Sequence, residues 1–383
     1  MAAKGPLSGV TVVDLSRILA GPYCTFLMAE LGARVIKVEA PPRGDDAREY
    51  GPFVNGKSAY FSSVNRGKQS IKLDLKNPTD KKVFEKLLAK ADVLVENFRP
   101  GTMEKLGYGW ADLHPRFPRL IYAAASGFGH TGPHSTRPAW DMVVQGLGGI
   151  MSITGHPGQP PVRVGMSIGD IAAGLYTAVG VNAALLHREK TGEAIKVDVA
   201  LFDCQLALLE NAIVRYTVSG EIPGPLGARH PTITPFEGFA TQDGYIIIAA
   251  GNDVTFARLA EALGKPALAK NPDYASNELR LKNQPKLKTE IEAALKTKTT
   301  GAWLTVFEQA GVPAGSINNI KQALDHPQVG PRNMLVTVDD PQSGKLKLAG
   351  NPIKMSGVPD PKTRAPAPAL DADREAILKE LGV

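Results

Sequence analysis

Short apolar runs alternate with amphipathic stretches along the first half of the chain. The apolar runs predict strands over 9–15, 34–39, 69–75, 92–96, 119–126 and 194–199. The stretches between them predict a helix over 20–31 that starts at an Ala-Gly-Pro turn, an amphipathic helix over 78–90 and a helix over 137–150 that ends in glycines. Strand, helix and strand joined by short turns are typical of a parallel, doubly wound sheet. We therefore predict an α/β fold, with a surface loop over the Gly-, Pro- and charge-rich stretch 41–65.

A second unit follows a predicted helix over 200–218. The stretch 220–230 is dense in Gly and Pro and is typical of a linker. Beyond it the pattern predicts a strand over 245–250 and helices over 254–263, 277–295 and 300–310. Strand-like pieces over 334–338 and 345–349 precede a Pro-rich segment, 352–368, and a last helix over 371–381. Such a proline-rich arm does not fold on itself, so it should lie over a surface of its own chain or of a partner.

The stretch 162–192 contains a carboxylate, Asp170, directly before a nearly uninterrupted apolar run over 171–186. Small and branched residues recur there without a polar face, which predicts a buried helix. The run is shorter than the roughly 20 residues of a membrane span. Asp170 stands where a helix N-cap would stand, and capping is one interpretation. The other is a nucleophile kept ionised by the positive end of the helix.

Composition narrows the function classes. The 383 residues are 43% hydrophobic and 21% charged, with a net charge of +6. No basic run with interleaved aromatics supports nucleic-acid binding, although the charge suits an anionic small ligand. Cys24 and Cys204 stand far apart in apolar contexts, so we expect buried free thiols in a reducing compartment. There is no metal-binding Cys or His cluster and no signal-peptide apolar region at the start, so we expect no metal and a cytoplasmic location.

Neither glycine-rich joint fits a dinucleotide site. The GLGGI at 146–150 does not open a helix after a strand, and the first strand–helix joint, SRILAGP, lacks the G-x-G-x-x-G spacing. An NAD-dependent oxidoreductase is therefore disfavoured.

Several segments in order resemble one family over essentially the whole chain. They are LSGVTVVDLSRILAGP, LGARVIKVE, NRGKQSIKLDLK, ADVLVENFRPG, SGFGHTGP, GDIAAGLYTAVG, HREKTG and GVPAGSINN. These segments are similar to the class III CoA-transferases, the formyl-CoA and carnitine CoA-transferase group that also contains α-methylacyl-CoA racemase. Within it the chain most resembles the branch that moves CoA from succinyl-CoA to a short dicarboxylate, of the succinate–glutarate type.

The resemblance implies a Rossmann-like large domain built from both chain ends, over 1–219 and 329–383. A smaller α/β domain with its linkers occupies 220–328. It also implies an interlocked homodimer whose substrates are acyl-CoA and carboxylic acids, with no permanently bound cofactor. Asp170 matches the family's nucleophile, which forms an aspartyl mixed anhydride and then an aspartyl-CoA thioester. A free Asp is ionised at pH 7, and we expect backbone N–H groups of the nearby glycines to stabilise the oxyanions.

The resemblance also assigns binding residues. CoA-binding positions are Ile18, Leu19, Ala20, Arg43, Leu73, Lys76, Asn97, Phe98, Arg99 and Lys105. Substrate-pocket positions are Arg17, Arg137, Trp140, Asp141 and Gly169. Arg43 is offered because many members carry an arginine where this chain has Ala40. Taken singly, each of these cations is more often a solvated surface residue, which is the alternative interpretation.

Trp140 separates the alternatives within the family. Racemases carry His immediately before the Asp that corresponds to Asp141, and indole cannot shuttle a proton at neutral pH. Trp140 is then either a pocket wall or ordinary core, and His130 and His134 lie in a loop upstream. A racemase and a non-catalytic CoA-binding homolog remain the alternatives. Formyl-CoA transferases resemble one another in a glycine-rich loop that shields the site. No run of four glycines precedes the strand over 245–250, which disfavours oxalate as the substrate. Candidates for binding a distal carboxylate are Arg17, Arg48, Arg137, Arg229 and His230.

Overall fold

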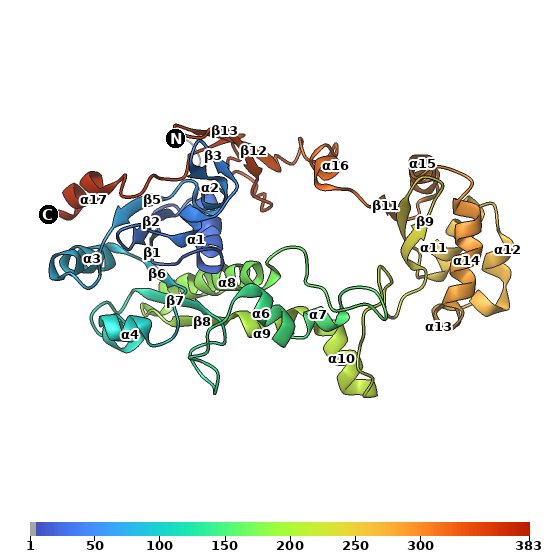
Figure 1. The fold of residues 1–383 in the computed structure, drawn as a ribbon, viewed down its shortest axis with the longest axis horizontal. Coiled ribbons are helices and arrows are strands. Elements are labelled where there is room, and N and C mark those ends of the chain that lie inside the picture. Colours follow the sequence, from blue (N-terminus) through green and yellow to red (C-terminus); the bar gives the residue numbers. More distant parts are fainter. Residues whose placement is uncertain (1–4) are drawn as a thin grey trace. The chain divides into compact units, whose positions relative to one another are not determined.

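The computed structural model describes residues 5–383, which form two compact units (Figure 1). The larger unit runs to Ser152 and includes Val162–Pro223 and Pro327–Val383, while the smaller comprises Ile153–Pro161 and Gly224–His326. The segment 153–161, which the sequence division kept with the first domain, thus packs with the smaller unit. Its anchor is a 2.8 Å hydrogen bond from the backbone N–H of Gly227 to the carbonyl of Gly155.

A six-stranded parallel sheet forms the centre of the larger unit. Its strands run in the order β5-β2-β1-β6-β7-β8, and every neighbouring pair is parallel. They are β1 (Thr11–Asp14), β2 (Arg34–Glu39), β5 (Gln69–Lys72), β6 (Val93–Glu96), β7 (Ile121–Ser126) and β8 (Lys196–Ala200). The predicted α/β fold with a parallel sheet is confirmed.

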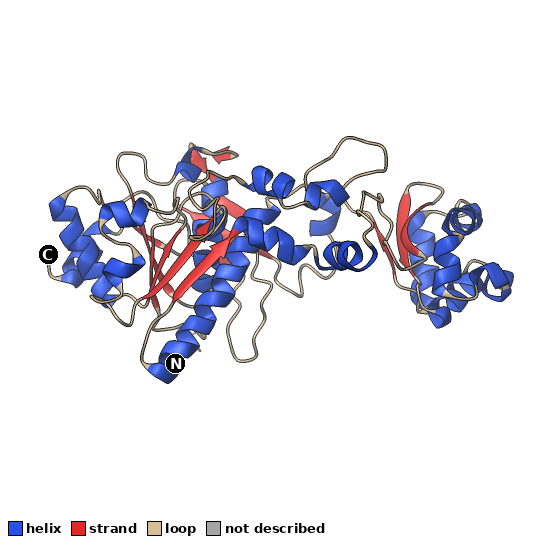
Figure 2. Ribbon diagram, turned by 90° about the horizontal axis from the view of Figure 1, so that it is seen from below, coloured by secondary structure: helices blue, strands red, loops and turns tan. Residues whose placement is uncertain are grey.

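Helices cover both faces of this sheet (Figures 1 and 2). On one face, α1 (Ala20–Glu30) and α8 (Ile168–Thr191) bury Met28 and Val181 against the strands. On the other, α3 (Pro78–Lys90) and α17 (Arg374–Leu381) bury Phe84 and Ile377. The last helix therefore returns to the sheet on which the chain began.

Three predicted stretches in this unit were wrong in detail. The helix predicted over 137–150 is two short helices, α6 (Asp141–Leu147) and α7 (Ile150–Ile153), separated where Gly149 takes a φ of 89°. The helix predicted over 200–218 breaks at Leu209 into α9 (Leu201–Leu208) and α10 (Glu210–Ser219). The stretch 41–65 is no simple loop. It contains the 3-10 turn η1 (Asp46–Glu49), the hairpin β3 (Phe53–Val54) and β4 (Lys57–Ser58), and α2 (Ala59–Asn65). The short helices α4 (Thr102–Leu106) and α5 (Trp110–Leu113) follow β6.

The smaller unit packs helices against a three-stranded antiparallel sheet. Its strands are β9 (Phe236–Ala240), β10 (Tyr245–Ala249) and β11 (Ala314–Ser316), of which sequence patterns predicted only β10. Its helical elements are α11 (Asp253–Ala262), α12 (Ala267–Lys270), η2 (Pro272–Tyr274), α13 (Asn277–Lys282), α14 (Gln284–Leu295) and α15 (Thr300–Ala310). The single helix predicted over 277–295 is thus divided at Asn283, directly before α14 and its Pro285.

The C-terminal arm lies on its own larger unit. Helix α16 (Ile320–Leu324) still belongs to the smaller unit. In the larger unit the chain then forms a sheet of β12 (Leu335–Asp340), β13 (Gly344–Ala349) and β14 (Thr363–Arg364). The Pro-rich segment then runs extended beside α2. The carbonyl of Pro366 accepts from the N–H of Gly67, and that of Ala367 accepts from Lys57 Nζ. The surface that this arm covers is therefore, at least in part, its own chain's.

Helix α8 is, among residues 5–383, the one helix with the length and hydropathy of a membrane span. Half of its most apolar window is buried inside the fold. Its contact with α1 is close, because a Cβ at Gly174 would lie 2.7 Å from the carbonyl oxygen of Ala20. Glycine at this position therefore lets the start of α1 pack against the second turn of α8.

Candidate active site

A cavity of about 380 Å³ opens where the carboxyl ends of several strands meet the first turn of α8. Ligands of open parallel sheets bind at this edge, beyond the carboxyl ends of the strands. Its lining includes Arg17, Ile18, Leu19, Ala20, Asn97, Phe98, Arg99, Arg137, Trp140, Asp141 and Asp170. The joint after β1, the loop after β6 and the approach to α6 are thus brought together around one carboxylate.

A second cavity, also of about 380 Å³, adjoins the first. Arg17, Phe98 and Thr102 line both. The second cavity lies beyond the ends of β1, β2 and β5, and its lining includes Leu73, Lys76 and Leu106. Together the two cavities form one elongated depression along the carboxyl edge of the sheet.

Asp170 is the third residue of α8. The helix begins at Ile168 after Ser167, so the predicted N-cap position was wrong by three residues. Asp170 does lie in the first turn, where the partial positive charge of a helix favours an anion. Its side chain is half-buried and faces the first cavity.

Burial outweighs the helix terminus at this carboxylate. Burial, followed by the negative charge of Asp141, raises the pKa of Asp170 to about 7. The expectation that Asp170 is fully ionised at pH 7 was therefore wrong, because only about half of the molecules carry the charged form when pH equals pKa. A desolvated carboxylate is a stronger nucleophile than one in water, so the same burial that suppresses ionisation favours attack by the ionised form.

Asp141 fixes the turn that carries Asp170. The N–H of Gly169 donates to Asp141 Oδ1 over 2.8 Å, and Gln145 Nε2 donates to Asp141 Oδ2 over 2.7 Å. The other amide atom of Gln145 accepts from the N–H of Val164 over 2.9 Å. Asp141 is only 8% exposed, so this acceptor holds α6, the segment before α8 and the first turn of α8 as one piece.

Gly169 is required by close packing rather than by its backbone angles. A Cβ there would lie 2.9 Å from Val144 Cγ2 and 3.1 Å from Asp141 Oδ1. Its N–H is already bound to Asp141, so the expectation that this glycine donates to an oxyanion was wrong. The N–H groups of Ile168 and Ile171 are bound as well, to the carbonyls of Met166 and Ser167.

Comparison with known proteins supplies the class of chemistry. A family model described as CoA-transferase family III matches residues 7–374. The chain belongs to CoA-transferase family III. It is 44% identical to the acetyl-CoA:oxalate CoA-transferase of Acetobacter aceti, over 98% of this chain and 96% of the relative. It is 38% identical to the human succinyl-CoA:glutarate CoA-transferase, over 98% and 86%. The crystal structure of a CAIB/BAIF family protein from Brucella suis superposes with a TM-score of 0.86 at 39% identity, over 99% of this chain and 100% of that one.

Membership makes this protein an enzyme that transfers CoA. The resemblance found in the sequence is confirmed, both for the family and for its dicarboxylate-using branch. The shared activity gives the elongated depression a candidate ligand, because CoA carries an acyl thioester at one end and a nucleotide at the other.

Most of the residues that the resemblance assigned lie around the depression. Ile18, Leu19, Ala20, Asn97, Phe98 and Arg99 line the first cavity, and Leu73 and Lys76 line the second. Arg43 lies outside both linings and pairs on the surface with Glu49, at 3.2 Å. Lys105 is also exposed and outside both, although Thr102 and Leu106 of the same helix line the second cavity.

Trp140 stands in the cavity lining and is 60% exposed, so it does not pack in the core of this chain. Its backbone is extended and immediately precedes α6. No histidine belongs to the described lining of this cavity. His130 instead lies beside the end of β6, with Nε2 3.6 Å from Glu96 Oε1, and His134 contacts Phe128.

The candidate cations for a distal carboxylate differ in what they already bind. Arg17 pairs with Asp46 at 3.0 Å, and Arg48 pairs with Glu39 at 2.6 Å. Arg229 and His230 belong to the smaller unit. Within residues 5–383, Arg137 has no carboxylate at ion-pair distance, and it lines the first cavity with Asp170.

Sequence reasoning missed Tyr60. Burial, followed by the negative charge of Asp170, raises the pKa of the Tyr60 phenol to about 12, so its hydroxyl remains protonated near Asp170. The residue lies in the first turn of α2 within the stretch 41–65, whose Gly and Pro content gave no sign of a helix. Gln145 was also missed, and its position four residues after Asp141 on one helix face is the signal that could have found it.

Proposed function

We propose that this enzyme moves CoA from succinyl-CoA, or a similar donor, to a short dicarboxylic acid. The observation that carries the proposal is Asp170, a desolvated carboxylate at one end of a depression long enough for an extended cofactor. The acyl thioester would lie beside Asp170, and the nucleotide would occupy the second cavity near Leu73 and Lys76. The names of the relatives support CoA donors and dicarboxylate acceptors.

The proposed reaction proceeds by exchange of activated acyl groups. An Asp170 oxygen attacks the thioester carbonyl, and the carbon–sulfur bond breaks to give an aspartyl mixed anhydride and CoA thiolate. The thiolate attacks the aspartyl carbonyl, releases the donor acid as its carboxylate and leaves an aspartyl-CoA thioester. The acceptor carboxylate attacks that thioester and again frees the thiolate. The thiolate then attacks the acyl carbonyl of the new anhydride, which yields the product acyl-CoA and restores Asp170.

Each step exchanges one anionic nucleophile for one anionic leaving group, so no net proton is transferred. The negative charge that develops on each carbonyl oxygen needs hydrogen-bond donors. We place these at the start of α1, because Leu19 and Ala20 line the cavity and α1 has no side-chain cap. The first N–H groups of a helix lack intrahelical acceptors and point out of its end.

We also propose that the enzyme is a homodimer, interlocked as the family resemblance implies. The support in this chain is an exposed apolar surface over α8, α9 and α10. Its members are Leu175, Tyr176, Val179, Leu186, Leu206, Leu208, Val214, Tyr216 and Val218. Apolar side chains gathered in this way mark protein contact surfaces.

Mass spectrometry after incubation with succinyl-CoA tests the covalent route. Hydroxylamine should leave a hydroxamate on the peptide that contains Asp170, and the Asp170→Ala variant should show none. Glutarate, oxalate and other short dicarboxylates are then compared as acceptors, with oxalate included because a relative at 44% identity bears its name. Wild-type enzyme that binds CoA but never forms the adduct with a short acyl-CoA would overturn the proposal in favour of a racemase or a binding protein.

A further inference from the structure

The joint between β1 and α1 carries an unusual backbone conformation. Ile18 has a φ of 68°, in the left-handed region that β-branched side chains rarely adopt. Such a conformation persists only where the surrounding structure enforces it. Ile18 lies in the lining of the first cavity, directly before Leu19 and Ala20, where α1 begins.

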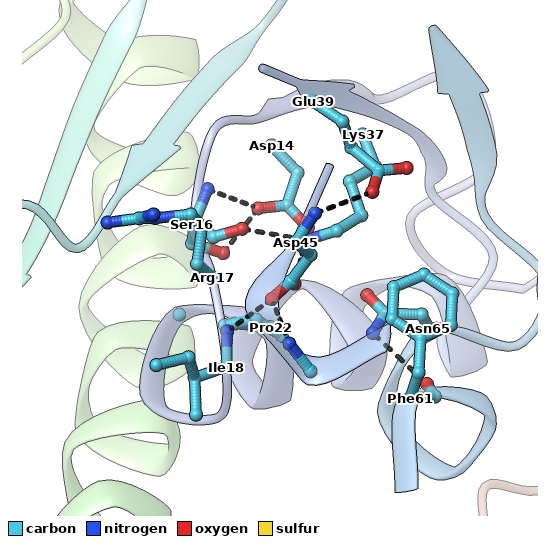
Figure 3. Close-up of polar contacts among 12 residues, drawn as sticks. Asp14, Ser16, Arg17, Ile18, Pro22, Lys37, Glu39, Asp45, Phe61 and Asn65 are labelled. Carbon is cyan, nitrogen blue, oxygen red and sulfur yellow. Dashed lines mark hydrogen bonds and ion pairs between the residues drawn. The ribbon is translucent and has the colours of Figure 1, made fainter. Parts of the chain in front are cut away.

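Side chains from other elements bind the backbone of this joint at each residue. The N–H of Ile18 donates to Asp45 Oδ1 over 2.9 Å. The N–H and the carbonyl of Arg17 both bond to the Asn97 amide, over 2.8 Å each. The carbonyl of Ser16 accepts from Lys37 Nζ over 2.6 Å. Figure 3 shows Lys37 of β2, and Asp45 from the segment after β2, converging on this joint.

Both oxygens of the Asp45 carboxylate have partners in this part of the fold. Its side chain is buried, and its Oδ2 lies 2.8 Å from Lys37 Nζ while its Oδ1 also accepts from the N–H of Ala47. Its own N–H donates to Glu39 Oε2 over 3.0 Å. Burial alone would raise the pKa of Asp45, but the Lys37 ammonium and these hydrogen bonds outweigh it, so the pKa lies below its ordinary value. The carboxylate is therefore charged, with Oδ1 bound to two backbone N–H groups and Oδ2 ion-paired with Lys37.

We propose that Asp45 is a positioning residue for CoA transfer, which acts by holding Ile18 in its left-handed conformation. This fixes where α1 begins and so places the N–H groups of Leu19 and Ala20 toward Asp170. The inference rests on the proposed function, since it assigns those groups to the oxyanion. The placement exists before substrate binds, which is the condition for electrostatic stabilisation at no cost of reorganisation.

The close packing of α1 on α8 makes this placement matter. The carbonyl of Ala20 would clash with any side chain at position 174, one turn beyond Asp170. A change in the conformation of Ile18 would therefore shift the start of α1 relative to the nucleophile. Shifts of about 1 Å in a catalytic group cost up to about 100-fold in rate.

A double-mutant cycle between Asp45 and Ile18 tests the proposal. Asp45→Ala is combined with Ile18→Gly, because glycine adopts a positive φ without penalty. The readout is the single-turnover rate of Asp170 acylation at saturating acyl-CoA, measured as hydroxamate in quenched samples. When position 18 is isoleucine, we expect Asp45→Ala to slow acylation about 10- to 100-fold. In the Ile18→Gly background, the fold-loss caused by Asp45→Ala should be at least about 5 times smaller.

Ile18→Gly itself removes a side-chain contact in the cavity and can lower the rate on its own. The rate of the double variant is therefore compared with that of Ile18→Gly and not with wild type. The proposal would be overturned if Asp45→Ala reduced the acylation rate by an equal or larger factor in the Ile18→Gly background. A general structural role of Asp45 predicts the same factor in both backgrounds. Asp45→Asn keeps the acceptor and the side-chain volume, and it should recover most of the rate. If Asp45→Ala does not fold, the cycle is run with Asp45→Asn, for which a smaller loss is expected, and that loss must again be smaller in the Ile18→Gly background. Wild-type enzyme without any adduct would contradict the proposed function instead, which keeps the two failures distinct.

Discussion

The Asp141 carboxylate accepts a hydrogen bond from the backbone N–H of Gly169. This contact places the negative charge of Asp141 beside Asp170, the residue that follows Gly169. One carboxylate is thus used twice. It holds the first turn of α8 in place, and it raises the proton affinity of the nucleophile. Replacing Asp141 should separate these two effects.

The first prediction concerns pH. Because the nucleophile must be ionised and its pKa lies near 7, acylation of Asp170 should rise with pH through a midpoint of about 7. Asp141→Asn keeps an oxygen for the N–H of Gly169 but removes the like charge, so its midpoint should move to lower pH. Burial remains, so the midpoint should stay above the ordinary aspartate value.

The acylation rate is measured in quenched-flow samples taken from about pH 5 to about pH 9, on both sides of the pKa. All quenched samples are treated with hydroxylamine at one fixed pH. Glu85→Gln, at a half-buried position of α3 outside the linings of both cavities, is the control and should keep the wild-type midpoint. A midpoint that is unchanged in Asp141→Asn would show that the Asp141 charge has no influence on the nucleophile.

The second prediction concerns stability. When the pKa of a carboxyl group is higher in the folded than in the unfolded state, the protein loses stability as the pH rises from the unfolded-state pKa to the folded-state pKa. For Asp170 this interval runs from 3.8 to about 7. Asp170→Asn cannot ionise, so its free energy of unfolding should exceed that of wild type by up to about 4 kcal/mol above pH 7, and by little at pH 4.

Urea unfolding at about pH 4, 6 and 8 spans the interval between the two pKa values of Asp170. It measures the difference in free energy of unfolding between Asp170→Asn and wild type. Asp339→Asn, which removes an exposed carboxylate on β12, is the matched control. A constant difference between Asp170→Asn and wild type at every pH would contradict the raised pKa.

The third prediction concerns Arg137, which lines the first cavity and, like Arg99, has no carboxylate at ion-pair distance in the described part of the chain. Charge-assisted hydrogen bonds to an anionic ligand contribute about 1.5–3 kcal/mol. Arg137→Ala should therefore raise one KM about 10- to 100-fold, and Arg137→Lys should recover part of it. A rise for acyl-CoA assigns Arg137 to the CoA phosphates, and a rise for the acceptor acid assigns it to a distal carboxylate.

Steady-state kinetics with each substrate varied at saturating levels of the other measures both constants. Arg119→Ala is the control, because Arg119 is exposed before the start of β7, at the opposite end of that strand from the cavity. Two unchanged KM values in Arg137→Ala would remove this residue from ligand binding.

The sequence was sufficient for the sheet but not for the charges beneath the site. The central parallel strands are short apolar runs buried on both faces, so their length and composition identify them directly. Lys37 and Lys68 are fully buried, whereas lysine is ordinarily a surface residue. Lys68 pairs with Asp14 at 3.0 Å, and Lys37 pairs with Asp45. These partners are distant in sequence, so no local pattern could have indicated them.

The proposed nucleophile and most of the proposed binding positions came from motif resemblance, whereas the path of the chain decides where each side chain lies. Arg43 was offered in place of the arginine that many members carry at the position of Ala40, and in this structure it pairs with Glu49. The raised pKa of Asp170 could not be anticipated, because it depends on burial and on Asp141, 29 positions earlier in the chain. Tyr60 and Asp45 lie in a stretch whose composition is typical of a surface loop.

The last prediction concerns assembly. Val179 is 66% exposed at the middle of α8, within the apolar surface that we assign to the homodimer. A buried carboxylate without a partner costs several kcal/mol, so Val179→Glu should prevent correct assembly. Light scattering after size exclusion should give twice the chain mass for wild type, and monomer or aggregate for Val179→Glu. Thr79→Glu introduces the same charge on an exposed position of α3 and should leave the dimer intact. A wild-type monomer that transfers CoA at full rate would contradict the homodimer, and it would leave the chemistry at Asp170 within a single chain.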